Sequence, residues 1–104
     1  MGHGNTAAEM QDLLAHAKML LSFETFEDLR DSVAEDEFPL EDRKDEEFGP
    51  EAEHEYQVVM HMDPVAFMDW IINNSLAGAQ MDRDFATMAY VTMTMARVQE
   101  FINA

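Results

Sequence analysis

The sequence predicts an all-α fold, a compact bundle of four to five helices with an acidic, loop-rich middle segment. Apolar residues recur at intervals of three and four along most of the chain, which is the spacing of one helix face. Residues that cap helices stand before most of these stretches. The chain has 104 residues and a hydrophobic fraction of 47%. This is enough for one core, so we expect a flexible N-terminus at residues 1–5 and a single helical domain at residues 6–104.

The first two helices are predicted from their caps. The segment Thr6–Glu9 fits a capping box, and the apolar spacing that follows predicts a helix to about Ser22. Thr25 is placed to cap a second, short helix. The apolar line of that helix is Phe26, Leu29 and Val33.

The middle of the chain loses this periodicity. From Glu35 to Gly49 the residues are mostly acidic and Pro39 interrupts them, which predicts a loop with at most one helical turn. Pro50 is well placed at the first position of a further helix. Residues 56–62 fit both a helix face and strand alternation. We favour a helix there and leave the strand open.

Two apolar helices are predicted to complete the fold. Asp63 and Pro64 open a helix that we expect to end near Gly78, and its nearly all-apolar surface belongs at the centre of a bundle or at a subunit interface. The last helix is expected from Asp82, as a cap, to Ile102. It carries a seam of coiled-coil type, made of Met88, Val91, Met95, Val98 and Ile102. This seam suits either core packing or self-association, so a homodimer stays an alternative.

The charge is both high and unevenly placed. The chain has 22 acidic and six basic residues, a net charge of −16. Fifteen of the acids lie between Glu24 and Glu55 beside three basic residues, which gives this stretch −12. Such a charge repels nucleic acids and anionic membranes and attracts basic proteins. Adaptation for solubility would spread acids over every exposed face, so the clustering favours a functional patch. A solvated loop without a role remains the alternative.

A basic nucleic-acid-binding protein is the partner that this charge predicts. Twelve carboxylates match the charge of about 20 Å of B-DNA, and arginine pairs with carboxylate much as it does with phosphate. The carboxylates predicted to bind the partner are Glu27, Asp28, Asp31, Glu35, Asp36, Glu41, Asp42, Asp45, Glu46 and Glu47.

Catalytic and metal sites are not predicted. The chain has no cysteine, which excludes disulfides and thiolate sites. Glu51 and His54 form a single Glu-x-x-His pair where a di-iron site needs two, and Asp12 with His16 supplies too few zinc ligands. We therefore expect no cofactor and no enzyme activity. Without a signal peptide or an apolar run of spanning length, we expect a cytoplasmic protein, or one in the host cytoplasm if it is viral.

Two short stretches resemble the acidic phage DNA-mimic anti-restriction proteins of the Ocr type. They are residues 16–20 (His-Ala-Lys-Met-Leu) and residues 26–31 (Phe-Glu-Asp-Leu-Arg-Asp), the second of which opens the acidic segment. The resemblance covers the first third of the chain and concerns composition and strategy more than sequence. It implies a helical, dimeric inhibitor that takes the place of DNA on a restriction, CRISPR or transcription protein. The alternative function is a non-catalytic adaptor or assembly chaperone that binds through the Met-rich C-terminal helices.

Overall fold

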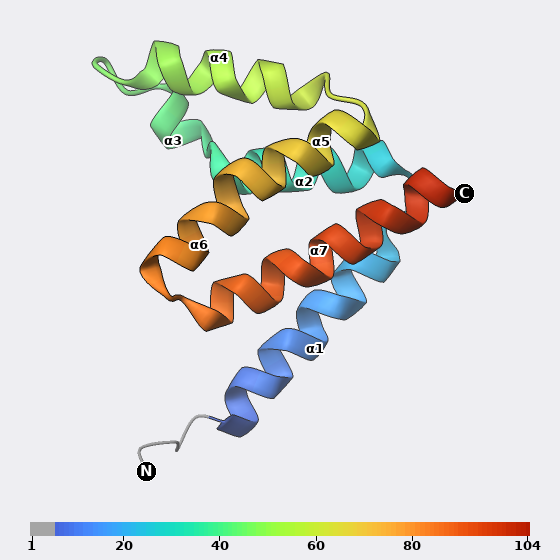
Figure 1. Cartoon of the computed structure of the whole chain (residues 1–104). Coiled ribbons are helices and arrows are strands. Elements are labelled where there is room, and N and C mark those ends of the chain that lie inside the picture. Colours follow the sequence, from blue (N-terminus) through green and yellow to red (C-terminus); the bar gives the residue numbers. More distant parts are fainter. Residues whose placement is uncertain (1–5) are drawn as a thin grey trace.

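Seven α-helical segments and one π-helical segment make up most of the chain in the computed structural model, which describes residues 6–104 (Figure 1). In chain order they are α1 (Thr6–Ser22), α2 (Phe26–Glu37), α3 (Leu40–Arg43), α4 (Gly49–Met60), α5 (Pro64–Ile71), η1 (Ile72–Leu76), α6 (Ala77–Asp82) and α7 (Phe85–Asn103). This part of the chain contains no strand, so the predicted all-α fold is confirmed. Because α5, η1 and α6 are continuous, it comprises five long helices and the single turn α3.

The first helix lies where it was predicted. It begins at Thr6 and ends at Ser22. The predicted flexible start at residues 1–5 lies outside the described residues, and so does the side chain of Thr6, on which the predicted capping box depends.

Two predicted caps are confirmed by their hydrogen bonds. The hydroxyl of Thr25 accepts the amide of Asp28 at 3.1 Å, which starts α2. The carboxylate of Asp63 accepts the amide of Ala66 at 2.8 Å, which starts α5. Each bond satisfies an amide that has no partner within its own helix.

The helix predicted to end near Gly78 continues to Asp82, so this boundary is corrected. Gly78 does not adopt a left-handed conformation; Arg83 does, with φ of 53°. The amide of Asp84 then donates to the carbonyl of Ala79 at 2.9 Å, a bond typical of a helix that closes on a left-handed residue. Asp82 was predicted to cap the last helix, and this is wrong, because it still belongs to α6. Asp84 caps α7 instead.

The acidic middle segment is more helical than predicted. α2 continues through Glu37, and α3, at residues 40–43, is the one helical turn that the prediction allowed. The irregular part is therefore limited to residues 38–39 and 44–48. Phe38 explains the extension: its amide donates to the carbonyl of Ala34 at 2.9 Å and its ring lies 6.3 Å from the ring of Trp70. Residues 56–62, left open between helix and strand, are helical as far as Met60.

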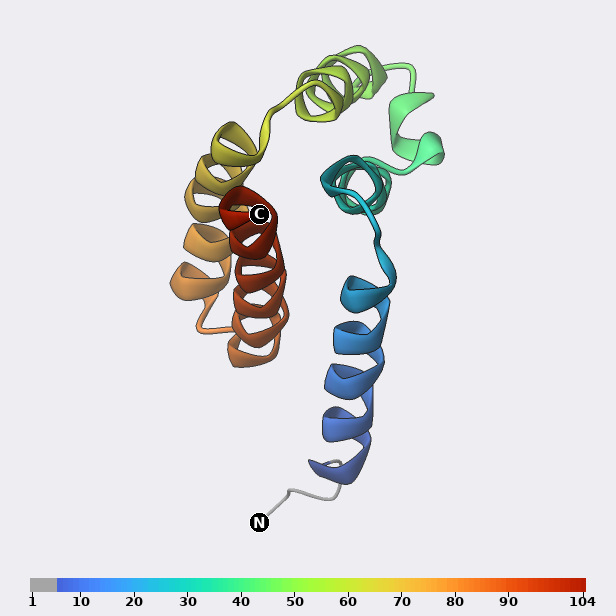
Figure 2. The same cartoon turned by 90° about the vertical axis from the view of Figure 1, so that its right-hand side faces the viewer.

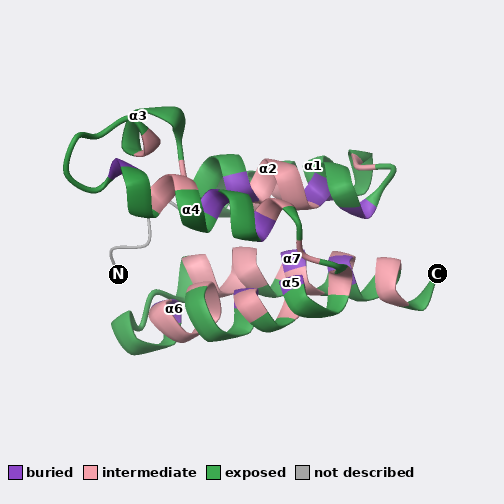
Figure 3. Ribbon diagram, turned by 90° about the horizontal axis from the view of Figure 1, so that it is seen from above, coloured by how far each residue is buried: buried purple, intermediate pink, exposed green. Residues whose placement is uncertain are grey.

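The helices form two layers. Figure 3 shows α5, α6 and α7 in one layer, with α1, α2, α3 and α4 in the other. α7 contacts both α1 and the helix formed by α5 and α6, while α2 and α3 pack against α4. The overall extents are 44 × 38 × 23 Å, with a radius of gyration of 14.9 Å where a compact chain of this size has about 13 Å. The molecule is therefore flattened.

The core joins the two layers through fully buried side chains. Leu29, Val59, Phe67 and Val98 are contributed by α2, α4, α5 and α7 respectively. The ring of Phe67 lies 5.5 Å from that of Phe26, at an angle of 75°. Edge-on aromatic contacts of this kind add to the stabilisation that burial alone supplies.

The apolar seam of the last helix is part of this core. Val98 is fully buried, Val91, Met95 and Ile102 pack against the core cluster, and Met88 is half-buried. The seam therefore serves core packing within the chain, and self-association through its partly exposed residues stays a prediction. Residues 6–104 include no helix with the length and apolar character needed to span a bilayer.

Candidate interaction face and cavity

The acidic residues of α2 are directed outward by the packing of its other side. Phe26, Leu29 and Ala34 are buried, so Asp28, Asp31 and Glu35, spaced by three and four residues, share the opposite side of the helix. In Figure 2, α2 and α3 lie on the right, away from α5, α6 and α7. We use the term acidic face for eight carboxylates of α2, α3 and the following loop, seven exposed and one, Asp31, partly covered. It comprises Glu27, Asp28, Asp31, Glu35, Glu41, Asp42, Glu46 and Glu47.

Arg43 fixes α3 to its neighbours. Its Nε donates to the carbonyl of Phe38 at 2.8 Å, and its guanidinium lies 3.8 Å from the centre of the Tyr56 ring. Its NH1 lies 3.5 Å from a carboxylate oxygen of Glu53. The side chain is only 14% exposed, so these contacts form away from most of the solvent. α3 and the acids that it carries are therefore held to both α2 and α4.

The loop after α3 is closed by a turn at Asp45. This carboxylate accepts the amides of Glu47 at 3.1 Å and Phe48 at 2.8 Å, and the carbonyl of Asp45 accepts the amide of Gly49 at 2.9 Å. A Cβ added to Gly49 would lie 2.6 Å from the backbone oxygen of Arg43, so the turn requires glycine here. Asp45 was predicted to bind a partner, but its carboxylate is engaged in this turn.

The ten predicted carboxylates lie in three different places. Eight of the ten make up the acidic face, and of these Asp31 is partly covered, with an ion pair of 3.0 Å to Arg30. Asp45 closes the loop. Asp36, although exposed, faces a cavity on another side of α2.

Three of the six basic residues are used inside the fold. Arg30 donates to the carbonyl of Met62 at 3.1 Å, and Arg97 donates to the carbonyls of Leu20 at 3.0 Å and Phe23 at 2.8 Å. Together with Arg43, these side chains are 14–19% exposed. The positive charge that they carry therefore serves helix ends and turns more than it offsets the acidic face.

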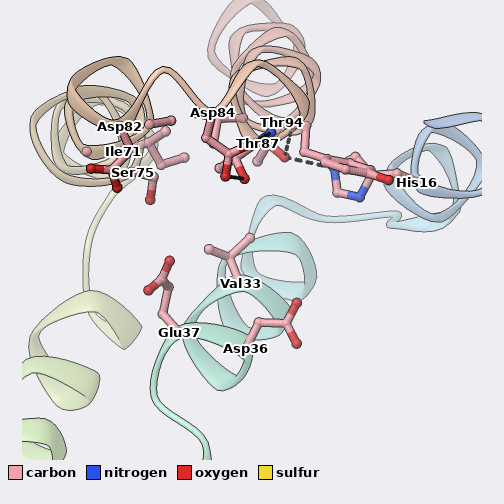
Figure 4. Close-up of a pocket in the computed structure, with 14 residues that line it drawn as sticks. His16, Val33, Asp36, Glu37, Ile71, Ser75, Asp82, Asp84, Thr87 and Thr94 are labelled. Carbon is pink, nitrogen blue, oxygen red and sulfur yellow. Dashed lines mark hydrogen bonds between the residues drawn. The ribbon is translucent and has the colours of Figure 1, made fainter. Parts of the chain in front are cut away.

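A cavity of about 400 Å³ lies between α1, α2, α6 and α7 (Figure 4). Its acidic side chains come from two directions: Asp36 and Glu37 from α2, and Asp82 and Asp84 from the end of α6 and the turn that follows it. Val33 and Ile71 contribute apolar wall. The π-helical segment η1 also reaches the cavity, through Ser75. Such segments occur often at functional sites.

His16 closes one end of the cavity. Its Nε2 lies 3.2 Å from the hydroxyl oxygen of Thr94, and that hydroxyl donates to the carbonyl of Tyr90 at 3.0 Å. The His16 ring also meets the Tyr90 ring edge-on at 5.0 Å. Its visible role is to fasten α1 to α7, and residues 6–104 contain no cluster of three potential metal ligands.

Among the acids that line the cavity, Asp84 has a perturbed pKa. The hydroxyl and the amide of Thr87 donate to its two carboxylate oxygens at 2.7 and 3.1 Å. These bonds, the hydroxyl first, lower the pKa of Asp84 below its ordinary value. The carboxylate therefore stays charged to lower pH than an ordinary aspartate.

Comparison with protein families, curated proteins and solved structures gives no match to this chain. The site is therefore interpreted from its own residues.

The sequence did not single out the cavity. Glu37, Asp82 and Asp84 were not among the predicted binding residues, and His16 was weighed only as a zinc ligand. The two acids from α2 lie at least 45 positions from Asp82 and Asp84 along the chain, and a spacing rule detects only residues that lie close in sequence. Their meeting depends on how α2 packs near the turn between α6 and α7.

Proposed function

We propose that this protein is an acidic inhibitor that mimics DNA and blocks the basic nucleic-acid-binding channel of a host defence protein, of restriction or CRISPR type, or of a transcription protein. The supporting observation is that regular structure holds the carboxylates of the acidic face. Its carboxylates stand on helices and on a closed turn. Arg43 is turned into the fold, and Arg30 donates inward to the carbonyl of Met62 while it pairs with one member of the face, Asp31. No catalytic step is part of this proposal.

The amount of charge suits such a role. Residues 24–55 carry −12, equal to about 20 Å of duplex DNA, and the molecule is 44 Å long and 38 Å wide. Carboxylates can accept two parallel hydrogen bonds from a guanidinium, as phosphates do. An array held by helices loses little conformational freedom on binding, which raises its affinity relative to a flexible acidic tail.

The test is a pull-down with a matched pair of triple variants. Immobilised protein is exposed to a bacterial lysate, and the retained nucleic-acid-binding proteins are challenged with 20-base-pair duplex DNA. We expect DNA to displace them. The variant Glu35→Lys, Asp42→Lys, Glu46→Lys should retain none of them.

The control variant, Glu9→Lys, Asp12→Lys, Asp69→Lys, changes the net charge by the same amount at exposed sites outside the acidic face. It should retain the same proteins as the wild type. Circular dichroism checks that both variants are folded. Equal retention by the two variants would end the proposal, since net charge alone would then explain binding.

A non-catalytic adaptor is the second candidate, and one observation favours it. α1 exposes an apolar stripe of Met10, Leu14 and Leu21, which are 59%, 59% and 67% exposed. The Met-rich C-terminal helices expected to form this interface are less suitable, because Met93 and Met95 pack against the core. Salt separates the two functions: the affinity of a DNA mimic falls steeply between low and moderate ionic strength, and that of an apolar interface changes little.

A further inference from the structure

We propose that the cavity between α1, α2, α6 and α7 is a receptor for one arginine side chain presented by a protein partner. This goes beyond the proposed function, because the cavity lies on a different side of α2 from the acidic face and needs no DNA-like array. It also commits to one chemical group, a guanidinium on an aliphatic stem.

The cavity is large enough to admit a single extended side chain. Its volume of about 400 Å³ lies at the lower end of the range for ligand pockets. A helix or a duplex does not enter such a space, whereas one extended side chain does.

The walls suit the stem of an arginine. Val33, Ile71 and Val91 line the cavity from three helices, and Tyr90 adds an aromatic ring. The methylene groups of a long cationic side chain bury well along apolar surface of this kind while the charged end remains among polar groups.

The charge of the lining is complementary to a cation. In Figure 4 the side chain of Glu37 points from α2 toward α6, whereas that of Asp36 points to the other side of α2. Asp82 lines the cavity from the end of α6. Within residues 6–104 these three carboxylates take part in no side-chain hydrogen bond or ion pair, and no lysine or arginine is among the residues that line the cavity. Asp84 differs, because Thr87 occupies both of its oxygens. A guanidinium between Asp82 and Glu37 would find acceptors on both sides, with Asp36 adding negative charge at the rim.

Arginine is favoured over lysine because the fold already uses the same arrangement. Arg43 lies over Tyr56 at 3.8 Å beside Glu53, and Arg97 lies over the Phe101 ring at 4.3 Å with Glu100 at 2.9 Å. A guanidinium can stack its planar face on an aromatic ring while its edge pairs bidentately with a carboxylate, and an ammonium group has neither a planar face nor this fork.

The direct test is a titration of the whole protein with a five-residue capped peptide that carries one central arginine between glycines. Nuclear magnetic resonance reports the binding through the signals of His16 and Thr94, which line the cavity. We expect these signals to shift with the arginine peptide and not with a peptide in which neutral citrulline replaces arginine.

The double variant Asp36→Asn, Glu37→Gln should weaken binding about tenfold, as expected for the loss of charged hydrogen bonds. The control Glu46→Gln, Glu47→Gln removes the same charge from the acidic face and should stay within about twofold of the wild type.

A second variant blocks the cavity without changing its charge. Gly78 lines the cavity, and a Cβ built there meets no heavy atom within 4 Å, so Gly78→Leu should fill the space and abolish peptide binding while the helical content is retained. Wild-type affinity in this variant, or equal binding of the citrulline peptide, would overturn the proposal. So would tighter binding of free spermidine than of the peptide, because the site would then be one for free polyamines. The experiment contains no nucleic-acid-binding protein, so its result is independent of the proposed function.

Discussion

Replacement of Arg43 by alanine tests whether one side chain holds the acidic segment in place. The substitution removes the hydrogen bond to the carbonyl of Phe38, the stacking on Tyr56 and the ion pair with Glu53. It leaves the Phe38 carbonyl without this donor. Since α3 is a single turn with no side-chain cap, it has little stability of its own.

The expected loss follows from these contacts. A charged hydrogen bond of 2.8 Å contributes about 1.5–3 kcal/mol, and a cation over an aromatic ring contributes about 0.5–2 kcal/mol. The carboxylate of Glu53 is 45% exposed, so its ion pair at 3.5 Å adds at most about 0.5 kcal/mol. Because contributions at one side chain are not additive, we expect Arg43→Ala to lower the free energy of unfolding by about 3 kcal/mol.

Urea denaturation measures this loss, and limited proteolysis locates it, with cleavage expected first between residues 38 and 49. Lys44→Ala is the matched control, because it removes the same charge from an exposed neighbour. It should cost less than about 0.5 kcal/mol. The reasoning is refuted if Arg43→Ala and Lys44→Ala unfold at the same urea concentration with equal resistance to protease.

Three further predictions concern the two glycines, the left-handed Arg83, and the pKa of Asp84. Gly49→Ala should lower the free energy of unfolding by about 1–3 kcal/mol, because the added Cβ collides with the backbone. Gly78→Ala should raise it by about 0.5–1 kcal/mol, because the added Cβ lies in open space within a helix. Denaturant midpoints that move in the same direction for both variants would contradict this contrast. Arg83→Gly should raise the free energy of unfolding by about 1 kcal/mol, because glycine adopts a φ of 53° without the Cβ clash. An unchanged or lower denaturation midpoint would count against this prediction. Thr87→Val should raise the pKa of Asp84 in a carboxyl titration followed by magnetic resonance, since the Thr87 hydroxyl contributes most to lowering it. The pKa of Asp84 is lower in the folded than in the unfolded state, so its stabilising effect is present above the unfolded pKa and is lost as pH falls through the folded pKa. Asp84→Asn should remove this part of the dependence of unfolding free energy on pH. Identical acid denaturation curves for the variant and the wild type would refute this role of Asp84.

The fold class was predictable because its signals are local. Capping by Thr25 and Asp63 and the apolar spacing of the long helices each depend on a few neighbouring residues. The same reasoning failed at Gly78 and Asp82, where a left-handed arginine ends the helix. Arginine rarely adopts that conformation, so the sequence carries no warning of it.

The site was predictable only in part, for a physical reason. Counting charged residues located the acidic segment, because the net charge of a segment follows from its sequence alone and does not depend on the fold. It could not show that Asp45 closes a turn or that Asp36 faces away from its neighbours. The inward roles of Arg30 and Arg97 depend on carbonyls that lie 32 and up to 77 positions away in the chain.

The flattened shape bears on how a chain with so much negative charge stays folded. The work of bringing like charges together falls as their separation grows. A slab 23 Å thick with a broad side of 44 × 38 Å lets carboxylates stand farther apart than a sphere of equal mass allows. The same geometry lowers the proportion of side chains that reach the interior, so the molecule exchanges some apolar burial for reduced self-repulsion.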